Sequence, residues 1–259
     1  MLCALAACAS PARQWWRHVA AAGFAATITP GDRFRHVVLD KPGRTAGVLH
    51  VYLDGDGTPW AGAAPAADPT PRHPLVLELM RLDENASLYL GRPCYHGLAG
   101  DPGCSAALWT SDRYGDAVVS SMAAALRTHL ASRAVDRLAF IGYSGGGALA
   151  LLLAPRFAET AAVVTLAANL DTDGWTAHHR YVRLTGSLNP ARQPPLPPHL
   201  YQRHYVGERD RVVPPGTLPP SVARAALVTV SGFDHVCCWP RLWPSVRADL
   251  ARALERSAR

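Results

Sequence analysis

Short runs of apolar residues alternate along the chain with longer segments of helical periodicity. The runs that predict strands are residues 37–39, 48–53, 86–90, 137–142, 161–167, 201–206 and 226–230. Helices are predicted for residues 74–82, for 145–153, from Trp243 to Arg256, and from a cap at Ser111 or Asp112 to about Arg133. Apolar strands separated by helices are typical of parallel sheets covered on both faces. The pattern therefore predicts an α/β fold with a doubly wound, mostly parallel sheet.

The chain has 259 residues, of which 49% are hydrophobic and 18% charged. This length suits one large α/β domain with an ample core, and it excludes a disordered chain and a small disulfide-stapled scaffold. We expect residues 35–259 to form that domain and residues 10–34 to form a segment that precedes it.

The net charge of +6 raises the question of a nucleic-acid partner. The positive charge comes almost wholly from scattered arginines, because Lys41 is the only lysine. Basic runs interleaved with aromatic residues, which are typical of nucleic-acid grooves, are missing. We therefore expect no nucleic-acid partner.

Residues 1–9 are apolar and contain Leu-Ala-Ala-Cys at positions 5–8, which resembles the lipobox of bacterial lipoproteins. The basic and apolar parts of a secretory leader are both short here, so residues 1–9 are interpreted as the remnant of a leader. This predicts an exported or membrane-anchored protein with a lipid anchor at Cys8. A cytoplasmic protein with an ordinary apolar start is the alternative. No run reaches the ~18 apolar residues of a membrane-spanning helix.

Four cysteines follow this start. Cys94 and Cys104 flank a short loop with glycine and proline, and we expect a disulfide between them in an oxidising compartment. Cys237 and Cys238 are adjacent and could form only a strained vicinal bridge, so they are expected to be free or redox-labile. No histidine and cysteine spacing is typical of a metal site, and no metal is expected.

Residues 142–146 read Gly-Tyr-Ser-Gly-Gly and match G-x-S-x-G between a predicted strand and a predicted helix. In that context the tight turn exposes the serine hydroxyl at the helix N-terminus, which predicts Ser144 as a nucleophile. A glycine-rich turn or a phosphate loop is the alternative. No lysine follows in P-loop register, and G-x-G-x-x-G is not matched.

A nucleophilic serine needs a base and an orienting carboxylate. His235 follows the last predicted strand and Asp210 the penultimate one, so both should lie at the sheet edge that carries Ser144. Asp171 and Glu208 are rivals of Asp210 for the orienting role. A surface ion pair with the flanking arginines is the alternative for Asp210.

Residues 54–57 read Asp-Gly-Asp-Gly directly after an early central strand. The backbone N–H groups of Asp56 and Gly145 are the candidate oxyanion donors of this edge. A plain glycine-rich turn or a cation-binding loop is the alternative, although EF-hand spacing fails because no glutamate closes a twelve-residue loop.

From about residue 37 to the C-terminus the chain resembles the α/β-hydrolases, and more narrowly those of proteobacterial lipoprotein type. The matching stretches are residues 52–57, 90–94, 142–147, 169–172 and 186–190. The resemblance implies an α/β-hydrolase fold with Ser144, Asp210 and His235 as its triad, in the chain order usual for this fold. No substantial lid domain fits between the strands, which disfavours an interfacially activated lipase.

These residues favour a serine hydrolase that cleaves a small-molecule carboxylic ester or thioester through an acyl-enzyme, with no cofactor. An acyltransferase or peptidase on the same fold is one alternative. A non-catalytic envelope binding protein that reuses the fold is another. The complete set of serine, histidine and aspartate favours an enzyme.

Overall fold

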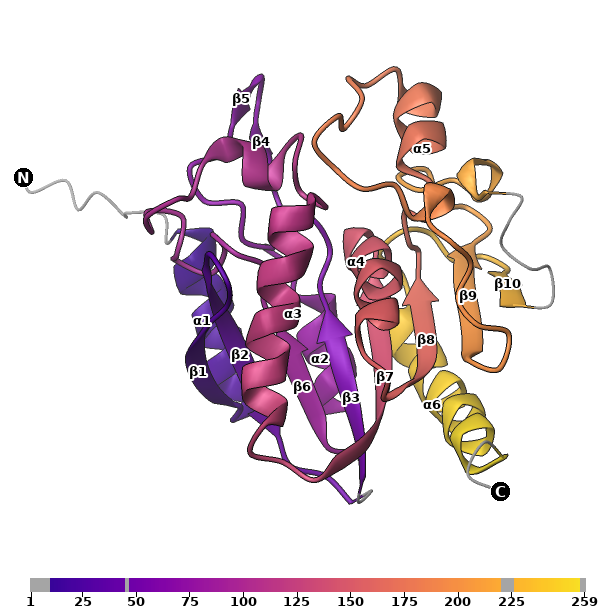
Figure 1. Cartoon of the computed structure of the whole chain (residues 1–259). Helices are drawn as coiled ribbons and strands as arrows, with labels where there is room; N and C mark the ends of the chain where they lie inside the picture. Colours follow the sequence, from indigo (N-terminus) through magenta and orange to yellow (C-terminus); the bar gives the residue numbers. More distant parts are fainter. Residues whose placement is uncertain (1–9, 45–46, 220–225, 257–259) are drawn as a thin grey trace, which may run out of the picture.

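An eight-stranded sheet in the order β1-β2-β6-β3-β7-β8-β9-β10 runs through the molecule (Figure 1). The structure is a computed structural model of the chain and describes residues 10–44, 47–219 and 226–256. The strands of the sheet are β1 (Ala25–Pro30), β2 (Arg35–Lys41), β3 (Gly47–Leu53), β6 (Ser87–Leu90), β7 (Val135–Tyr143), β8 (Thr160–Leu166), β9 (Tyr201–Gly207) and β10 (Leu227–Val230). β2 pairs antiparallel with β1 and with β6, whereas the other neighbours are parallel. The predicted mostly parallel sheet is confirmed.

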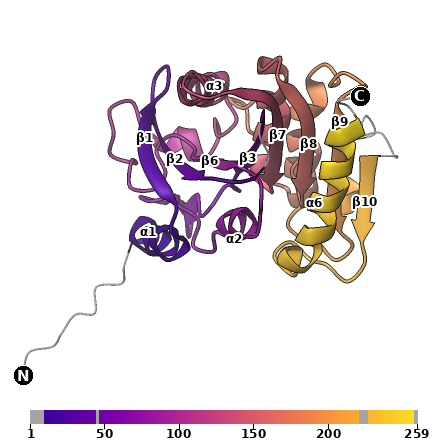
Figure 2. The same ribbon diagram turned by 90° about the horizontal axis from the view of Figure 1, so that it is seen from below.

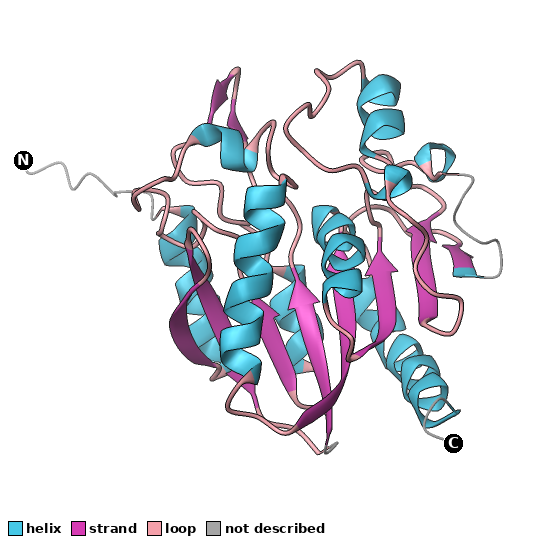
Figure 3. Ribbon diagram, in the orientation of Figure 1, coloured by secondary structure: helices cyan, strands magenta, loops and turns pink. Residues whose placement is uncertain are grey.

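Helices cover both faces of this sheet (Figure 2). One face carries α1 (Pro11–Ala22), α2 (Leu75–Arg81) and α6 (Trp239–Arg256), and the other carries α3 (Asp116–Leu130) and α4 (Gly145–Leu153). Beyond the carboxyl ends of the central strands lie α5 (Thr172–His179) and the hairpin of β4 (Trp60–Ala61) and β5 (Ala64–Pro65) (Figure 3). Short 3-10 helices span Ala106–Trp109, Ala154–Arg156, Pro190–Arg192 and Pro215–Thr217.

The central strands are buried on both faces because their side chains alternate between two hydrophobic clusters. In β7, Leu138 and Phe140 pack toward α3 and α4, whereas Ala139 and Ile141 pack toward α6. This double burial is the reason why the strands appear in the sequence as continuous apolar runs. The arrangement leaves the carboxyl ends of β3, β7, β8, β9 and β10 along one edge.

The N-terminal segment 10–34, expected to precede the domain, instead contributes α1 and β1 to it. Trp15 and Val19 of α1 are buried in the core, and β1 pairs along its length with β2. The sequence did not predict β1 because the strand lies at the sheet edge, where only Thr29 is buried. An exposed edge strand carries no apolar run that a pattern could detect.

Two helix starts also differ from expectation. Residues 111–115 form turns, and α3 begins at Asp116, because Arg113 and Tyr114 turn toward the carboxylate of Asp56. The last helix begins at Trp239, four residues before its expected start, with Trp239 buried in the core.

The expected leader remnant, with its proposed anchor at Cys8, lies outside the described residues. Within the described ranges no helix combines the length and apolar character needed to cross a bilayer.

Two pairs of cysteines are bonded in the structure. The bridge expected between Cys94 and Cys104 is present, with Cα atoms 5.7 Å apart, and it closes a loop that packs on Trp109. Cys237 and Cys238, expected to be free or redox-labile, are joined by a vicinal disulfide in the turn before α6. The structure corrects the expectation of free thiols, and the redox lability of this pair stays a prediction.

Candidate active site

Ser144 occupies the tight turn between β7 and α4. Its backbone has φ 52° and ψ −123°, a conformation that costs energy for a residue with a side chain. A Cβ at Gly142 would lie 2.4 Å from the carbonyl oxygen of Gly146, so the turn admits no side chain there. The backbone N–H of Ser144 donates to the carbonyl of Leu166 at 3.0 Å and ties the turn to β8. The turn holds Ser144 at the carboxyl edge of the sheet.

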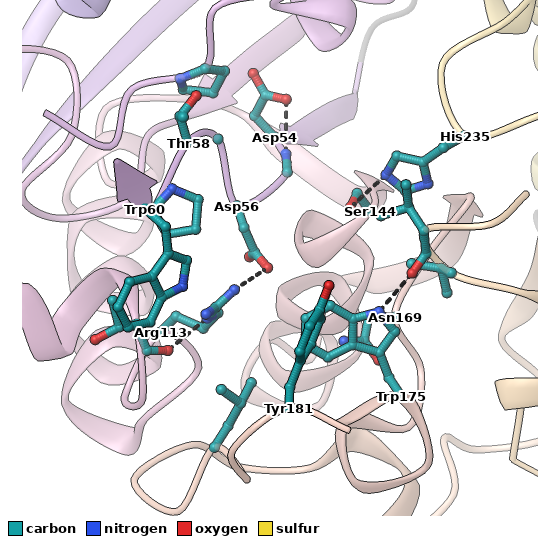
Figure 4. Close-up of a pocket in the computed structure, with 18 of the residues that line it drawn as sticks. Asp54, Asp56, Thr58, Trp60, Arg113, Ser144, Asn169, Trp175, Tyr181 and His235 are labelled. Atoms are coloured by element: carbon teal, nitrogen blue, oxygen red, sulfur yellow. Dashed lines mark hydrogen bonds and ion pairs between the residues drawn. The ribbon is translucent and has the colours of Figure 1, made fainter. Parts of the chain in front are cut away.

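A continuous hydrogen-bond chain runs from Ser144 through His235 to Asp210 (Figure 4 shows the first pair). His235 Nε2 lies 3.1 Å from Ser144 Oγ, and His235 Nδ1 lies 2.8 Å from Asp210 Oδ2. The other carboxylate oxygen, Asp210 Oδ1, accepts from the backbone N–H groups of Val212 and Val213, each at 2.8 Å. The side chain of Asp210 is fully buried, so its loop and the imidazole hold it in one orientation.

The loop that carries His235 is fixed from both sides. Tyr143 Oη and Trp239 Nε1 donate to the carbonyl oxygen of His235 at 2.9 and 3.0 Å. Asp234 accepts from the two backbone N–H groups that follow His235, at 2.8 and 2.7 Å. The imidazole is therefore positioned by β7, by α6 and by its own turn.

The rival carboxylates have other partners. Asp171 caps α5 by accepting from the backbone of Asp173 and Gly174, and it also accepts from Asn189 Nδ2 at 2.8 Å. Glu208 is exposed and accepts from the hydroxyl and backbone of the turn after β10. Among the described residues, the carboxylate that contacts the imidazole is that of Asp210.

Asp56 and Gly145, the two candidate oxyanion donors, lie side by side. A Cβ at Gly145 would fall 2.0 Å from Asp56 Oδ1, so only glycine lets the two segments approach this closely. Within the described part of the chain neither backbone N–H donates a hydrogen bond. Asp56 also lines the cavity beside Ser144, and Gly145 directly follows Ser144 at the start of α4.

The carboxylate of Asp56 anchors its loop. It accepts from Arg92 at 2.8 Å, from Arg113 at 2.9 Å and from the hydroxyl of Tyr114 at 2.7 Å. Burial alone would raise the pKa of Asp56, but the guanidinium groups of Arg113 and Arg92 outweigh burial and hold it below its usual range. These charged partners keep the loop after β3 in place.

Asp54 is the unusual carboxyl group of this edge. Its Oδ1 accepts from the backbone of Gly55 at 2.8 Å, while its Oδ2 is buried with no hydrogen-bond partner among the described residues. Burial raises its pKa from 3.8 to about 7, against the lowering effects of the Gly55 N–H and of Arg92.

Because of this pKa shift, the free energy of unfolding of the wild-type protein should fall as the pH rises. The Asp54→Asn variant should not show this loss. A carboxyl whose pKa is raised by folding contributes stability below its unfolded pKa of 3.8, and that stability is lost as the pH rises to about 7. We expect the free energy of unfolding of the variant, relative to the wild type, to increase by about 2 kcal/mol between pH 5 and pH 7. Urea unfolding of both proteins at the two pH values measures this. Parallel pH dependences would contradict the shift.

Asn169 is a buried polar side chain that the sequence analysis did not single out. Its backbone N–H donates to the carbonyl of Ser144 at 3.2 Å, and its side-chain Oδ1 has no hydrogen-bond partner in the described structure. It lies beside Ser144 in the cavity wall (Figure 4). Asn169 follows β8 at the same sheet edge as Ser144, and this position in the sequence could have indicated that it lies near Ser144.

A cavity of about 950 Å³ opens above Ser144. Trp60 lies on one side of it, and Trp175 and Tyr181 lie on the other (Figure 4). Two tryptophans, Trp60 and Trp175, line the cavity, whereas Trp109 and Trp239 are buried away from it.

Comparison with known proteins identifies the fold. The sequence matches no protein-family model and no curated protein. A protein of unknown function from Agrobacterium tumefaciens superposes with a TM-score of 0.61 at 15% identity, covering 89% of this chain and 97% of that one. An α/β serine hydrolase without a lid from Xanthomonas campestris gives 0.56 at 16% identity, with 90% and 94% covered. An esterase from Pyrococcus furiosus gives 0.59 at 14% identity, with 91% of each covered.

These similarities extend over nearly the whole chain. The predicted α/β-hydrolase fold is therefore confirmed.

Proposed function

We propose that this chain, which has the α/β-hydrolase fold, is a serine hydrolase that cleaves carboxylic esters or thioesters through an acyl-enzyme. The observation that carries the proposal is the hydrogen-bond chain from Ser144 through His235 to Asp210 at the base of a cavity. A serine, an imidazole and a buried carboxylate in this order form the arrangement needed for nucleophilic acyl transfer.

In the first half of the reaction, Ser144 Oγ attacks the substrate carbonyl carbon while His235 Nε2 takes the hydroxyl proton. The tetrahedral intermediate collapses, the bond to the leaving group breaks, and His235 returns the proton to the departing alcohol or thiol. A water molecule then attacks the acyl-enzyme with His235 again as base, which releases the acid and regenerates Ser144. Asp210 holds the imidazole in the required tautomer and stabilises its charged form.

The backbone N–H groups of Asp56 and Gly145 supply the oxyanion site in this proposal. Each donor that meets the developing negative charge is worth about 3 kcal/mol of transition-state stabilisation. The ion pairs of Asp56 with Arg92 and Arg113 support this role, because they hold the loop still during the reaction. Gly145 opens α4, whose N-terminus also favours negative charge.

Hydrolysis of a series of p-nitrophenyl esters tests the proposal. We expect the wild-type protein to hydrolyse at least one of the acetate, butyrate and octanoate esters, because the cavity offers room for a small acyl group beside Ser144. The Ser144→Ala variant serves as the blank for spontaneous hydrolysis. Release of nitrophenol no faster than this blank, for every ester tested, would contradict an esterase.

A further inference from the structure

The large hydrophobic side chains that the described residues expose gather at the mouth of the cavity. Val182 is 89% exposed and Tyr181 is 56% exposed, and both line the mouth. Trp60 and Val212 line it as well and are about half exposed. Apart from these, the exposed large hydrophobics of the described chain are Val236, next to His235, and Ile28 on β1. Exposed apolar groups concentrated in one place mark an interaction site.

These side chains are carried by the parts of the molecule that extend furthest beyond the sheet. Trp60 lies in the β4–β5 hairpin, and Tyr181 and Val182 lie in the loop that follows α5 (Figure 1). Trp60 and Tyr181 face each other across the cavity (Figure 4). A flat surface that approaches from this side would meet both segments together.

The wall that carries Tyr181 is ordered by its own contacts. The Tyr181 ring stacks on His179 with centroids 5.0 Å apart and meets Trp175 edge-on at 5.3 Å. Trp175 Nε1 and His179 Nε2 both donate to the carbonyl of Val212, at 2.7 and 2.9 Å. The apolar groups are therefore held in an exposed position, with no need to unfold or turn outward.

Cationic side chains accompany the apolar ones. Arg72 and Arg180 line the same cavity and are exposed, and Arg211 is exposed directly beside Val212. None of these three arginines forms an ion pair with a described acidic residue. The rim thus combines unpaired positive charge with aromatic and aliphatic groups, on a chain of net charge +6.

We propose that this rim binds the surface of an anionic lipid bilayer or micelle, and that the substrate ester enters the cavity from that surface. Tryptophan and tyrosine favour the interface between lipid and water, and arginines near it are attracted by anionic headgroups. At the mouth of the cavity Val182 leaves most of its apolar surface in water, and contact with a lipid surface would remove that surface from water. The statement about the substrate rests on the proposed hydrolase function, whereas the statement about lipid binding stands without it.

Co-sedimentation with lipid vesicles tests the binding. We expect the protein to sediment with phosphatidylglycerol vesicles. The double variant Tyr181→Ser/Val182→Ser should bind these vesicles at least about tenfold more weakly. The control is Ile28→Ser, which removes a large apolar group that is 49% exposed on β1, far from the rim in sequence and sheet order. The double variant Arg72→Gln/Arg180→Gln should bind more weakly than the wild type and lose its dependence on the anionic lipid content.

Parallel assays with the soluble ester p-nitrophenyl butyrate separate this proposal from the proposed function. The Arg211→Gln variant, whose exposed side chain does not line the cavity, should keep its kcat/KM on that ester while its binding to anionic vesicles falls. Absence of wild-type sedimentation, or equal binding by Tyr181→Ser/Val182→Ser and Ile28→Ser, overturns the lipid proposal. Equal binding by Arg211→Gln and the wild type on anionic vesicles also overturns it, because the positive charge of the rim would then play no part. Failure to hydrolyse any ester would overturn the proposed function and leave the sedimentation result intact.

Discussion

Replacement of Ser144 by alanine is expected to lower kcat toward an ester by roughly 10⁶-fold, because the variant has no group that can form the acyl-enzyme. Any residual rate would come from binding and from the N–H groups of Asp56 and Gly145. The fold should survive, since alanine meets the same backbone demand at φ 52° as serine does. Steady-state kinetics with the best p-nitrophenyl ester, together with a melting curve, measure both effects.

The matched control for this variant is Ser111→Ala. Ser111 lines the same cavity, but its hydroxyl donates to Asp112 and does not contact His235. This control should keep its kcat within a few-fold of the wild type. A Ser144→Ala variant as active as the control would show that another group attacks the substrate.

Asp210→Asn is expected to lower kcat by roughly 10⁴-fold with the protein still folded. The amide oxygen can go on accepting from the backbone of Val212 and Val213, so the loop keeps its anchor. The amide nitrogen would then face His235 Nδ1 as a donor, which forces the imidazole into the wrong tautomer for accepting the proton of Ser144. The kcat and the melting temperature of the variant are both measured and compared with those of the wild type.

Asp171→Asn and Glu208→Gln are the controls for Asp210→Asn. Asparagine still caps a helix well, so Asp171→Asn should leave α5 and the rate nearly unchanged. Glu208 is exposed and contacts only the turn after β10, and its loss should also be small. A collapse of kcat in Asp171→Asn, with Asp210→Asn active, would reassign the orienting carboxylate.

The sequence predicted much of this sheet edge because one rule applied several times. Ser144, Asp210 and His235 each follow a parallel strand, and parallel strands bring their carboxyl ends to the same edge. Central strands such as β7 were readable because double burial makes them continuous apolar runs, whereas β10 is a partly exposed edge strand. No distance within the triad had to be known in order to expect these three residues near one another.

The contacts of Asp56 could not be predicted in the same way. Arg92 and Arg113 lie 36 and 57 residues away in the chain, and which of the many arginines would pair depends on sheet order and loop path. Arg92 does follow β6 at the same edge, which is a usable signal, whereas Arg113 lies in a turn that the sequence analysis predicted as helix.

Strand β1 was missed because an exposed edge strand needs little apolar character.

The most direct measurement for the central claim is peptide mapping by mass spectrometry after treatment with a fluorophosphonate probe. Such a probe forms a stable adduct with a serine only where a neighbouring base and an oxyanion site activate it. The account predicts one adduct, on the peptide that contains Ser144, and its absence in folded Ser144→Ala protein. An unlabelled wild-type protein, or an adduct that persists in Ser144→Ala, would contradict the account.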